Sequence, residues 1–324
     1  MEKPTPIIVS GSIAIDRIMS FTGRYREIIR PEKLESLSVS VLLDSLNDSD
    51  GGVGANIAYT LALLGDSPIL LGSAGKDATA YLEKLAHAGV TITAVHTSDL
   101  HTATYTVFTD SEENQVAGFY PGAMSDSESL SIEPWKDQSP LMLVSPHDPA
   151  AMARQVRECQ KWNIRLCYDV GQQVTSLPAA DMKEGIKAAS IVIVNEYEMG
   201  MLAARLETDA DTIKKSVPVV ITTFGKGGSV IEGSAVPEPL NIEIVKATQV
   251  VDPTGAGDCY RAGFLYGYSR GWDLRICGQL GATCATYAIE QTGTQNHSFS
   301  FKEVAERYQK NFTQALPPTQ NATH

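Results

Sequence analysis

An acidic residue placed directly after a glycine-rich turn is the strongest chemical signal in this sequence. Residues 252–258 read Asp-Pro-Thr-Gly-Ala-Gly-Asp, and a helical pattern over Ala256–Ser269 begins inside them. Small residues at the beginning of a helix leave backbone N–H groups open, and these groups stabilise an anion together with the helix dipole. Asp258 is placed to accept a proton from a hydroxyl group that attacks such an anion. The alternative is a plain glycine-rich turn in which Asp258 is an ordinary acid of a first helical turn.

A second glycine-rich segment also precedes a predicted helix. Residues 51–56 read Gly-Gly-Val-Gly-Ala-Asn, and the helical pattern continues to Leu64. Glycines let a ligand approach the backbone closely, and the Asn56 amide offers both a donor and an acceptor to sugar hydroxyls. A tight turn with Asn56 bonded to the backbone is the alternative. The segment has no third glycine in register and no strand directly before it, so a dinucleotide-binding fingerprint is not indicated.

Two further polar segments follow predicted strands. Residues 222–228, Thr-Thr-Phe-Gly-Lys-Gly-Gly, could form a loop around nucleotide phosphates or a plain hairpin turn. Asn195 and Glu198 could share one face of a first helical turn and hold a hydrated Mg²⁺ near phosphates, or they could form a capping pair. The sequence contains neither G-x-x-x-x-G-K-[ST] nor G-x-S-x-G, which excludes a P-loop NTPase and gives no indication of a nucleophile-elbow hydrolase.

Short apolar runs alternate with longer amphipathic stretches along the chain. The predicted strands are Pro6–Val9, Pro68–Gly72, Leu141–Val144, Ile164–Tyr168, Ser190–Val194 and Pro218–Thr223. The predicted helices are Ala55–Leu64, Thr79–Ala88, Pro149–Trp162, Ala180–Ala188, Glu196–Ala204 and Ala256–Ser269. This alternation is typical of a parallel sheet with helices on its faces, in which ligands bind at the carboxyl ends of the strands.

Two segments break the alternation and predict a small sheet that covers the site. Arg17–Asp50 contains a β-like run at Leu37–Leu43, and Thr102–Tyr120 reads as two strands joined by a polar turn over residues 110–114. Tyr105 and Phe119 on these strands are core residues by default. Aromatic side chains on a mobile cover can also sandwich a flat base.

Composition restricts the choice of partner and compartment. The 324 residues are 43% hydrophobic and 20% charged, with a formal net charge of −12. Such a negative charge argues against nucleic acid or an anionic membrane surface as the main partner. No segment has the ~18 apolar residues of a membrane helix, and five cysteines without a CxxC pair indicate no disulfide framework. We therefore expect a cytoplasmic protein, with a frayed tail over residues 317–324.

Together, the motifs resemble the ribokinase-like carbohydrate kinases, also called the phosphofructokinase B family. The two glycine-rich segments match its N-terminal and C-terminal signatures, apart from Pro253, where Thr is frequent. The resemblance covers essentially the whole chain. A narrower similarity to the family's bacterial adenosine kinases rests on Gly11–Asp16, Phe119–Met124, Asp169–Gln173 and Gly293–Gln295.

The resemblance implies a fold and a reaction. The expected fold is a single α/β domain over residues 1–324. It is a three-layer α/β/α sandwich with a mostly parallel central sheet and a small β-sheet lid, formed by segments of about 17–50 and 102–120. The implied reaction is MgATP-dependent phosphoryl transfer to a primary hydroxyl, in which the protein supplies positioning and charge stabilisation while the lid excludes water. The lid strands form a dimer interface in some relatives, and the sequence leaves a homodimer open here.

The resemblance also implies roles for individual residues. Asp258 would be the base, and the backbone of Gly255, Ala256 and Gly257 would form the anion hole. The residues implied on the nucleoside side are Asp16, Asn56 and Gly52 for the ribose, Ser12, Gln172 and Gln173 for orientation, and Tyr105 and Phe119 around the base. Tyr105 stands where Phe is expected, which keeps the stacking face and adds a hydroxyl.

On the ATP side, the family pattern implies Asn195, Thr223, Gly225, Lys226 and Gly228. Glu198 would organise Mg²⁺ through water, and a monovalent cation such as K⁺ would bind near Asp252 and Thr254. The activity expected from this resemblance is the phosphorylation of adenosine to AMP, a step of purine salvage. The alternatives are another nucleoside or sugar kinase of the family, or a nucleoside-binding protein without catalysis, against which the intact Asp258 argues.

Overall fold

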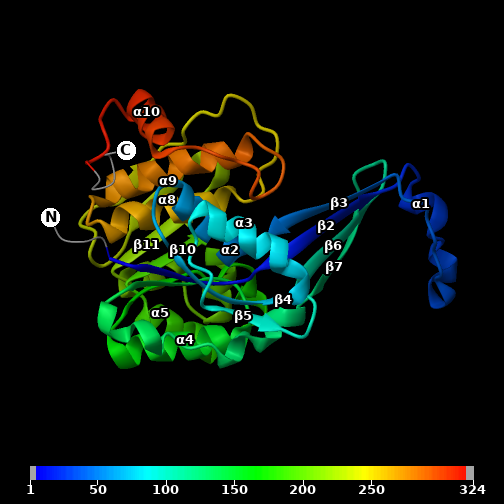
Figure 1. The fold of residues 1–324 in the computed structure, drawn as a ribbon, viewed down its shortest axis with the longest axis horizontal. Coiled ribbons are helices and arrows are strands. Elements are labelled where there is room, and N and C mark those ends of the chain that lie inside the picture. Colours follow the sequence, from blue (N-terminus) through cyan, green and yellow to red (C-terminus); the bar gives the residue numbers. More distant parts are fainter. Residues whose placement is uncertain (1–4, 319–324) are drawn as a thin grey trace.

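Strands and helices alternate along most of the chain, as expected (Figure 1). A computed structural model describes residues 5–318. Of the tail expected over residues 317–324, everything after Pro318 lies outside the described residues. In the described part, none of the helices is both long and apolar enough to cross a bilayer.

A nine-stranded sheet forms the centre of the described structure. Its order is β13 (Leu240–Ile242), β12 (Ser229–Glu232), β11 (Val219–Thr223), β10 (Ile191–Asn195), β9 (Arg165–Tyr168), β8 (Leu141–Val144), β1 (Ile7–Ser10), β4 (Ile69–Gly75) and β5 (Val95–Ser98). Strand β12 is antiparallel to both of its neighbours, and the other pairs are parallel.

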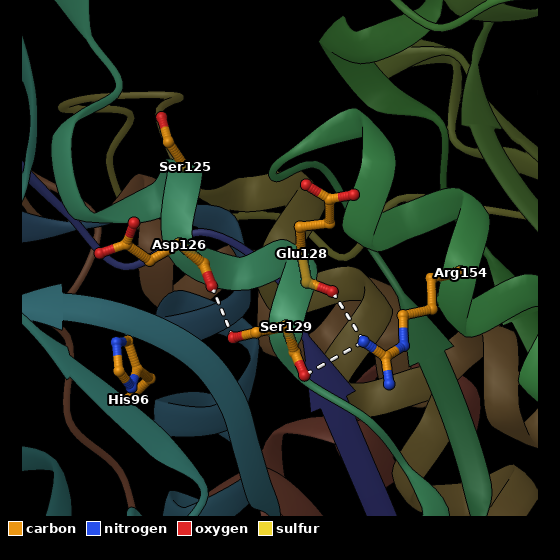
Figure 2. A pocket seen from close by; sticks show the side chains of 6 residues that line it. All are labelled: His96, Ser125, Asp126, Glu128, Ser129 and Arg154. Carbon is orange, nitrogen blue, oxygen red and sulfur yellow. Dashed lines mark hydrogen bonds between the residues drawn. The ribbon is translucent and has the colours of Figure 1, made fainter.

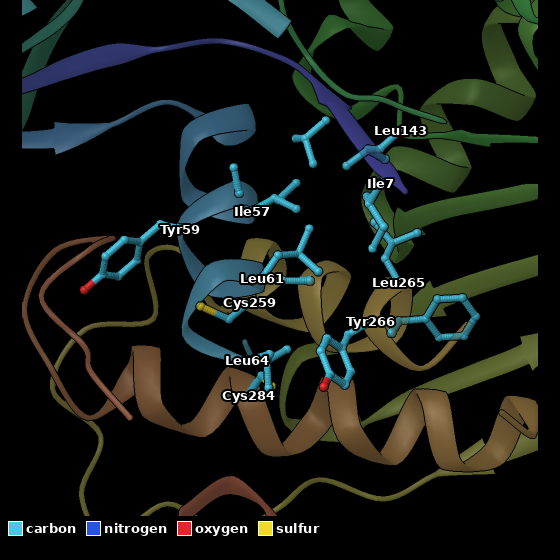
Figure 3. Close-up of a cluster of buried hydrophobic side chains, with 14 of the residues drawn as sticks. Ile7, Ile57, Tyr59, Leu61, Leu64, Leu143, Cys259, Leu265, Tyr266 and Cys284 are labelled. Atoms are coloured by element: carbon cyan, nitrogen blue, oxygen red, sulfur yellow. The ribbon is translucent and has the colours of Figure 1, made fainter. Parts of the chain in front are cut away.

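The side chains of each central strand divide between two hydrophobic cores, because successive residues of a strand point to opposite faces. In β10, Ile191 and Ile193 belong to one core and Val192 and Val194 to the other. The first core is closed by α2 (Val53–Leu63), α3 (Thr79–Ala88), α8 (Ala256–Ser269), α9 (Leu274–Ile289) and α10 (Phe301–Phe312). Figure 3 shows part of this core, where Ile57 and Leu61 of α2 point into the same cluster as Leu265 of α8.

The second core lies under the helices of the other face. These are α4 (Pro149–Trp162), α5 (Ala179–Ala188), α6 (Glu196–Arg205) and α7 (Ala210–Ser216). The result is the predicted three-layer α/β/α sandwich with a mostly parallel sheet.

A separate four-stranded sheet, here called the lid, extends away from the sandwich (Figure 1). Its order is β3 (Ser45–Gly51), β2 (Ala14–Ser20), β6 (Ala103–Thr109) and β7 (Gln115–Tyr120), with β2 and β6 parallel. The lid and the two strands of residues 102–120 are therefore confirmed.

The strand expected at Leu37–Leu43 is wrong. Those residues have no regular structure and follow α1 (Tyr25–Ile28) and the 3₁₀ segment Pro31–Ser36. In the described part of the chain no strand pairs with them, and Leu42 is 91% exposed, so their β-forming side chains have little to pack against. Strand β2 pairs instead with the polar strand β3. Across this pair, Asp48 accepts hydrogen bonds of 2.8 and 2.7 Å from Arg17 of β2.

Candidate functional site

Polar residues follow the carboxyl ends of several parallel strands, and these ends lie at one edge of the central sheet. Ser12 follows β1, Asp169 follows β9, Asn195 ends β10 and Thr223 ends β11. Asn195 and Thr223 are direct partners across the β10–β11 pair. The lid begins at the same edge, because Ala14 opens β2 only four positions after β1 ends at Ser10. This edge is where ligands bind in open α/β sheets.

The first turn of α2 is held by the loop that follows β1. Ser12 accepts hydrogen bonds from the N–H of Val53 through Oγ at 3.0 Å and from the N–H of Ala55 through its carbonyl at 3.2 Å. Gly52 precedes the helix with φ 92°, and a Cβ atom there would lie 2.5 Å from the Ser12 carbonyl oxygen. Only glycine fits this position. Ser12 and Gly52 thus fix the beginning of α2, and the Ser12 hydroxyl keeps a proton that it can donate.

The Asn56 side chain joins the two glycine-rich motifs. Its Nδ2 donates to Oδ2 of Asp258 at 2.8 Å, and its Oδ1 accepts from Nε2 of Gln295 at 2.8 Å. Gln295 also donates to the hydroxyl of Tyr81, which donates to the Gly51 carbonyl at 2.8 Å. Asn56 is therefore not bonded to the backbone as in a simple turn. Because both ends of its amide have partners, the amide is oriented with its donor toward Asp258.

The first turn of α8 presents open backbone donors. Gly255 caps the helix with φ 81°, and Asp258 stands in its first turn without capping it. Among residues 5–318, no hydrogen bond from the protein uses the N–H of Gly255, Gly257 or Asp258, whereas that of Ala256 donates to Pro253 at 3.3 Å. Of the three backbone groups expected in the anion hole, those of Gly255 and Gly257 are thus open and that of Ala256 is engaged.

Two partly buried carboxylates, Asp16 and Asp258, belong to this site and interact electrostatically. Burial raises the pKa of Asp16 to about 6, and the charge of Asp258 adds to the shift. Burial also raises the pKa of Asp258, against the opposing effects of Arg261 and of the Asn56 hydrogen bond. A carboxylate with a raised pKa is a stronger proton acceptor than a solvated one, which suits a general base.

One row of residues runs across the lid from Asp16. In the pairing register, Asp16 of β2 lies beside Tyr105 of β6, which lies opposite Phe119 of β7. Residues paired in this way share a face of a sheet. Tyr105 is 37% and Phe119 50% exposed. Since Asp16 interacts with Asp258, the lid face that carries both aromatic rings is turned toward the site.

Gln172 and Gln173 lie on the 3₁₀ segment Gly171–Thr175 that follows β9. Nε2 of Gln173 donates to the carbonyl of His147 at 2.6 Å, so one end of this amide is engaged inside the protein. Gln172 is exposed. The structure thus places Gln172 at the surface after β9, while Gln173 has one N–H engaged and keeps its oxygen and its second N–H.

The residues implied on the ATP side form local structures of their own. Asn195 and Glu198 make a capping box, in which each side chain accepts a 2.8 Å hydrogen bond from the backbone N–H of the other. Residues 224–228 form a hairpin turn between β11 and β12, closed by the Phe224 N–H to the Gly228 carbonyl at 2.8 Å. Gly225 and Gly228 adopt positive φ there, and Lys226 is exposed. The capping pair and the hairpin turn, which the sequence left open as purely structural alternatives, are therefore both formed.

The charges around Glu198 are compatible with a hydrated divalent cation. Glu198 uses Oε2 in its capping box and lies near Asp258 and the buried carboxylate of Asp169, with Arg261 as the cation among them. In residues 5–318, no group of three or more His, Cys, Asp or Glu residues is placed to bind a metal directly. A Mg²⁺ ion here would thus be held by ATP phosphates and by water. Both oxygens of Asp252 accept backbone N–H groups, from Thr254 and Gly293 at 2.9 Å, so Asp252 ties two loops together and K⁺ binding there stays a prediction.

Another open groove of about 640 Å³ contains none of the predicted site residues (Figure 2). It is lined by His96, Ser125, Asp126, Glu128, Ser129 and Arg154. Arg154 donates to the carbonyls of Glu128 and Ser129, and Asp126 accepts from Ser98. Arg154 and Asp126 are thus engaged within the protein.

Sequence and structure comparisons agree with this geometry. Residues 15–300 match the family model described as pfkB family carbohydrate kinase. A nucleoside kinase of Methanocaldococcus jannaschii is 29% identical, over 96% of this chain and 98% of its own length. The structure of Burkholderia thailandensis nucleoside kinase in complex with inosine is 30% identical, with a TM-score of 0.84 over 96% of this chain and 100% of the other.

A ribokinase of Thermotoga maritima shares the fold, with a TM-score of 0.79 at 19% identity over 95% of this chain and all of the other. The family match covers both glycine-rich motifs, the lid strands and the segment that carries Gln295. The chain belongs to the pfkB family of carbohydrate kinases.

Proposed function

We propose that this chain is an ATP-dependent nucleoside kinase that transfers the γ-phosphoryl group of ATP to the 5′-hydroxyl of adenosine. The observation that carries the proposal is the contact between Asn56 and Asp258 beside open backbone N–H groups. It places a proton acceptor and anion-stabilising donors within one helical turn. A hydroxyl nucleophile and a phosphoryl group need that combination.

In the proposed reaction, the 5′-oxygen attacks the γ-phosphorus, and the bond from that phosphorus to the β,γ-bridging oxygen breaks. ADP leaves with the bonding electron pair. The hydroxyl proton passes to Asp258, whose Oδ2 is already held by Asn56. The N–H groups of Gly255 and Gly257 stabilise the charge on the moving phosphoryl group. Bound Mg²⁺ supplies further neutralisation of the ATP phosphates.

A nucleoside is favoured over a free sugar by the lid. Asp16 can bind ribose hydroxyls from the same row that carries Tyr105 and Phe119, and two aromatic rings can flank a purine. The M. jannaschii and B. thailandensis relatives are both named nucleoside kinases. Because the B. thailandensis enzyme was solved with inosine, inosine is the second candidate substrate.

A substrate panel tests the proposal. Adenosine, inosine, guanosine, cytidine, uridine, ribose and fructose would each be supplied with ATP and Mg²⁺, and ADP release would be measured in a coupled assay. We expect the highest kcat/KM with adenosine. Faster turnover of inosine would select the second candidate, and turnover of ribose or fructose alone would refute a nucleoside kinase. A melting shift with nucleosides but no ADP release would instead indicate a binding protein.

A further inference from the structure

Arg261 projects a guanidinium group beside the open N–H groups of α8. It stands one turn after Gly257 on that helix, and helical side chains lean back toward the N-terminus. A Cβ atom on Gly257 would lie 2.8 Å from Nη1 of Arg261. The absence of a side chain at Gly257 therefore leaves room for the guanidinium. The Arg261 side chain is 11% exposed.

One edge of the guanidinium is anchored by Asp169. Nε of Arg261 lies 2.7 Å from Oδ2 of Asp169, and Nη2 donates to Oδ1 at 2.9 Å. Asp169 itself follows β9, and its backbone N–H donates to the Val144 carbonyl at 2.9 Å. Among residues 5–318, none of the hydrogen bonds found uses Nη1 of Arg261. The anchored edge thus directs the remaining nitrogen toward Gly257.

The charges around Arg261 belong to the site. Its guanidinium interacts with Asp169, Asp258 and Glu198, and Nη2 lies 3.9 Å from Oε2 of Glu198. These are one cation and three carboxylates. Guanidinium groups remain charged at every physiological pH, and they bind phosphate oxygens well. A fixed cation at this position meets the negative charge of an incoming triphosphate.

We propose that Arg261 is a catalytic residue whose Nη1 donates to an oxygen of the phosphoryl group during transfer. This inference rests on the proposed kinase activity and goes beyond it. In the step, the 5′-oxygen to phosphorus bond forms, the bond to the leaving ADP oxygen breaks, and the proton goes to Asp258. Arg261 neither gains nor loses a proton in this step. It stabilises the negative charge on the phosphoryl group during transfer. Asp169 is then a positioning residue that holds the guanidinium.

A purely structural role is the alternative, in which Arg261 only neutralises Asp169. The same helix offers a matched control for it. At the C-terminal end of α8, Arg270 pairs with Asp66 at 2.9 Å, and its side chain is also 11% exposed. A structural role predicts that removing either arginine has the same kind of effect, on stability. A catalytic role predicts that only Arg261 affects turnover.

The experiment compares the wild type with Arg261→Met, Arg261→Lys and Arg270→Met. The readouts are kcat from ADP release, nucleoside affinity by calorimetry, melting temperature, and the affinity of ADP with Mg²⁺ and aluminium fluoride in the presence of nucleoside. This last mixture mimics the phosphoryl group in transfer. We expect Arg261→Met to lower kcat by about 10²-fold or more and to lose the mimic, with nucleoside affinity changed less than about threefold. Arg270→Met should lower the melting temperature and leave kcat near normal.

Arg261→Lys keeps the charge and one contact with Asp169, so it covers the case in which the methionine variant does not fold. A single ammonium cannot bond Asp169 with two nitrogens and also reach Gly257, and we expect it to lose most of kcat as well. Near-normal kcat in Arg261→Lys, or a loss in Arg261→Met no larger than in Arg270→Met, would overturn the inference. If the wild type itself turns over no nucleoside, the result refutes the proposed function and not the role of Arg261 alone.

Discussion

The side-chain amide of Asn56 donates a 2.8 Å hydrogen bond to the carboxylate of Asp258, although 202 positions separate the two residues. The contact joins the beginnings of α2 and α8, each of which follows a glycine with positive φ. It occupies one oxygen of Asp258 and leaves the other for a ligand. The two glycine-rich motifs thus act as one site.

The role of Asp258 as the base is tested by Asp258→Asn. The amide has nearly the shape of the carboxylate and can still bond to Asn56 after its own rotation, so the protein should fold and bind nucleoside. We expect kcat to fall about 10²-fold or more, as loss of a general base implies. Coupled ADP detection measures kcat, and calorimetry measures nucleoside affinity. Near-normal turnover in this variant would refute the role.

The orientation of the Asn56 amide depends on Gln295, which is 3% exposed and donates to it at 2.8 Å. Gln295→Met keeps the volume and removes this donor. We expect about a tenfold loss in kcat/KM, because the Asn56 amide can then rotate away from Asp258.

The matched control for this prediction is Asn296→Ala, at the exposed next position, where the side chain donates to the Thr292 carbonyl. This variant should retain normal activity. Equal losses in both variants would show that Gln295 acts only through the stability of its loop.

The raised pKa of Asp258 predicts how turnover depends on pH. The base works only when it is deprotonated, so activity should be lost as pH falls through the raised pKa of Asp258. Glu198→Gln removes a negative charge that raises the pKa of Asp258, so it should move this acidic limb of the pH profile to lower pH. Initial rates at saturating nucleoside between pH 5 and 8.5 measure the limb.

The control for the pH profile is Asp48→Asn on the lid. Asp48 pairs with Arg17 by contacts of 2.8 and 2.7 Å on the exposed surface. Its substitution should leave the acidic limb in place. An unmoved limb in Glu198→Gln would mean that the charge of Glu198 does not raise the pKa of Asp258.

Most of the sandwich could be predicted from the sequence, because its buried strands are continuous apolar runs. The runs at β1, β8, β10 and β11 each match an expected strand to within a residue at either end. The short edge strands β5 and β13 carry no such signal. Helix α9 is also not singled out by the sequence pattern, because Gly278 and Gly281 weaken it; in the fold these glycines fit against neighbouring elements. Lid strand β3 is polar and depends on its partner, so local propensity points to the wrong segment.

In the site as well, residues marked by a local sequence pattern could be predicted, and residues that act through contacts between distant segments could not. Spacing alone singles out Asp258 and Asn56, since each follows a glycine-rich turn. Tyr81 carries no signal in the sequence, because its contribution is a hydrogen bond to the Gly51 carbonyl across the fold. Gln295 belongs to a segment that resembles adenosine kinases, but only the structure shows that it orients Asn56. Arg261 reads as an ordinary helix residue until Asp169 is seen beside it.

The raised pKa of the partly buried Asp16 carboxylate indicates that this residue lowers the stability of the fold at neutral pH. Its pKa is about 6 in the folded protein, above the 3.8 of an Asp in an unfolded chain. The folded state therefore binds the proton more tightly, and the stability this confers is present below pH 3.8 and lost as pH rises through about 6. Above that pH the charged carboxylate destabilises the fold, and Asp16→Asn removes the charge.

We expect Asp16→Asn to melt a few degrees higher than the wild type at pH 8 and at nearly the same temperature at pH 4, although its activity is reduced. Melting curves at both pH values measure the difference, with Asp48→Asn as a surface control. A variant that is equally stabilised at pH 4 and pH 8 would show that side-chain packing, and not the charge of Asp16, is responsible. Residues that carry a charge for function commonly reduce stability in this way.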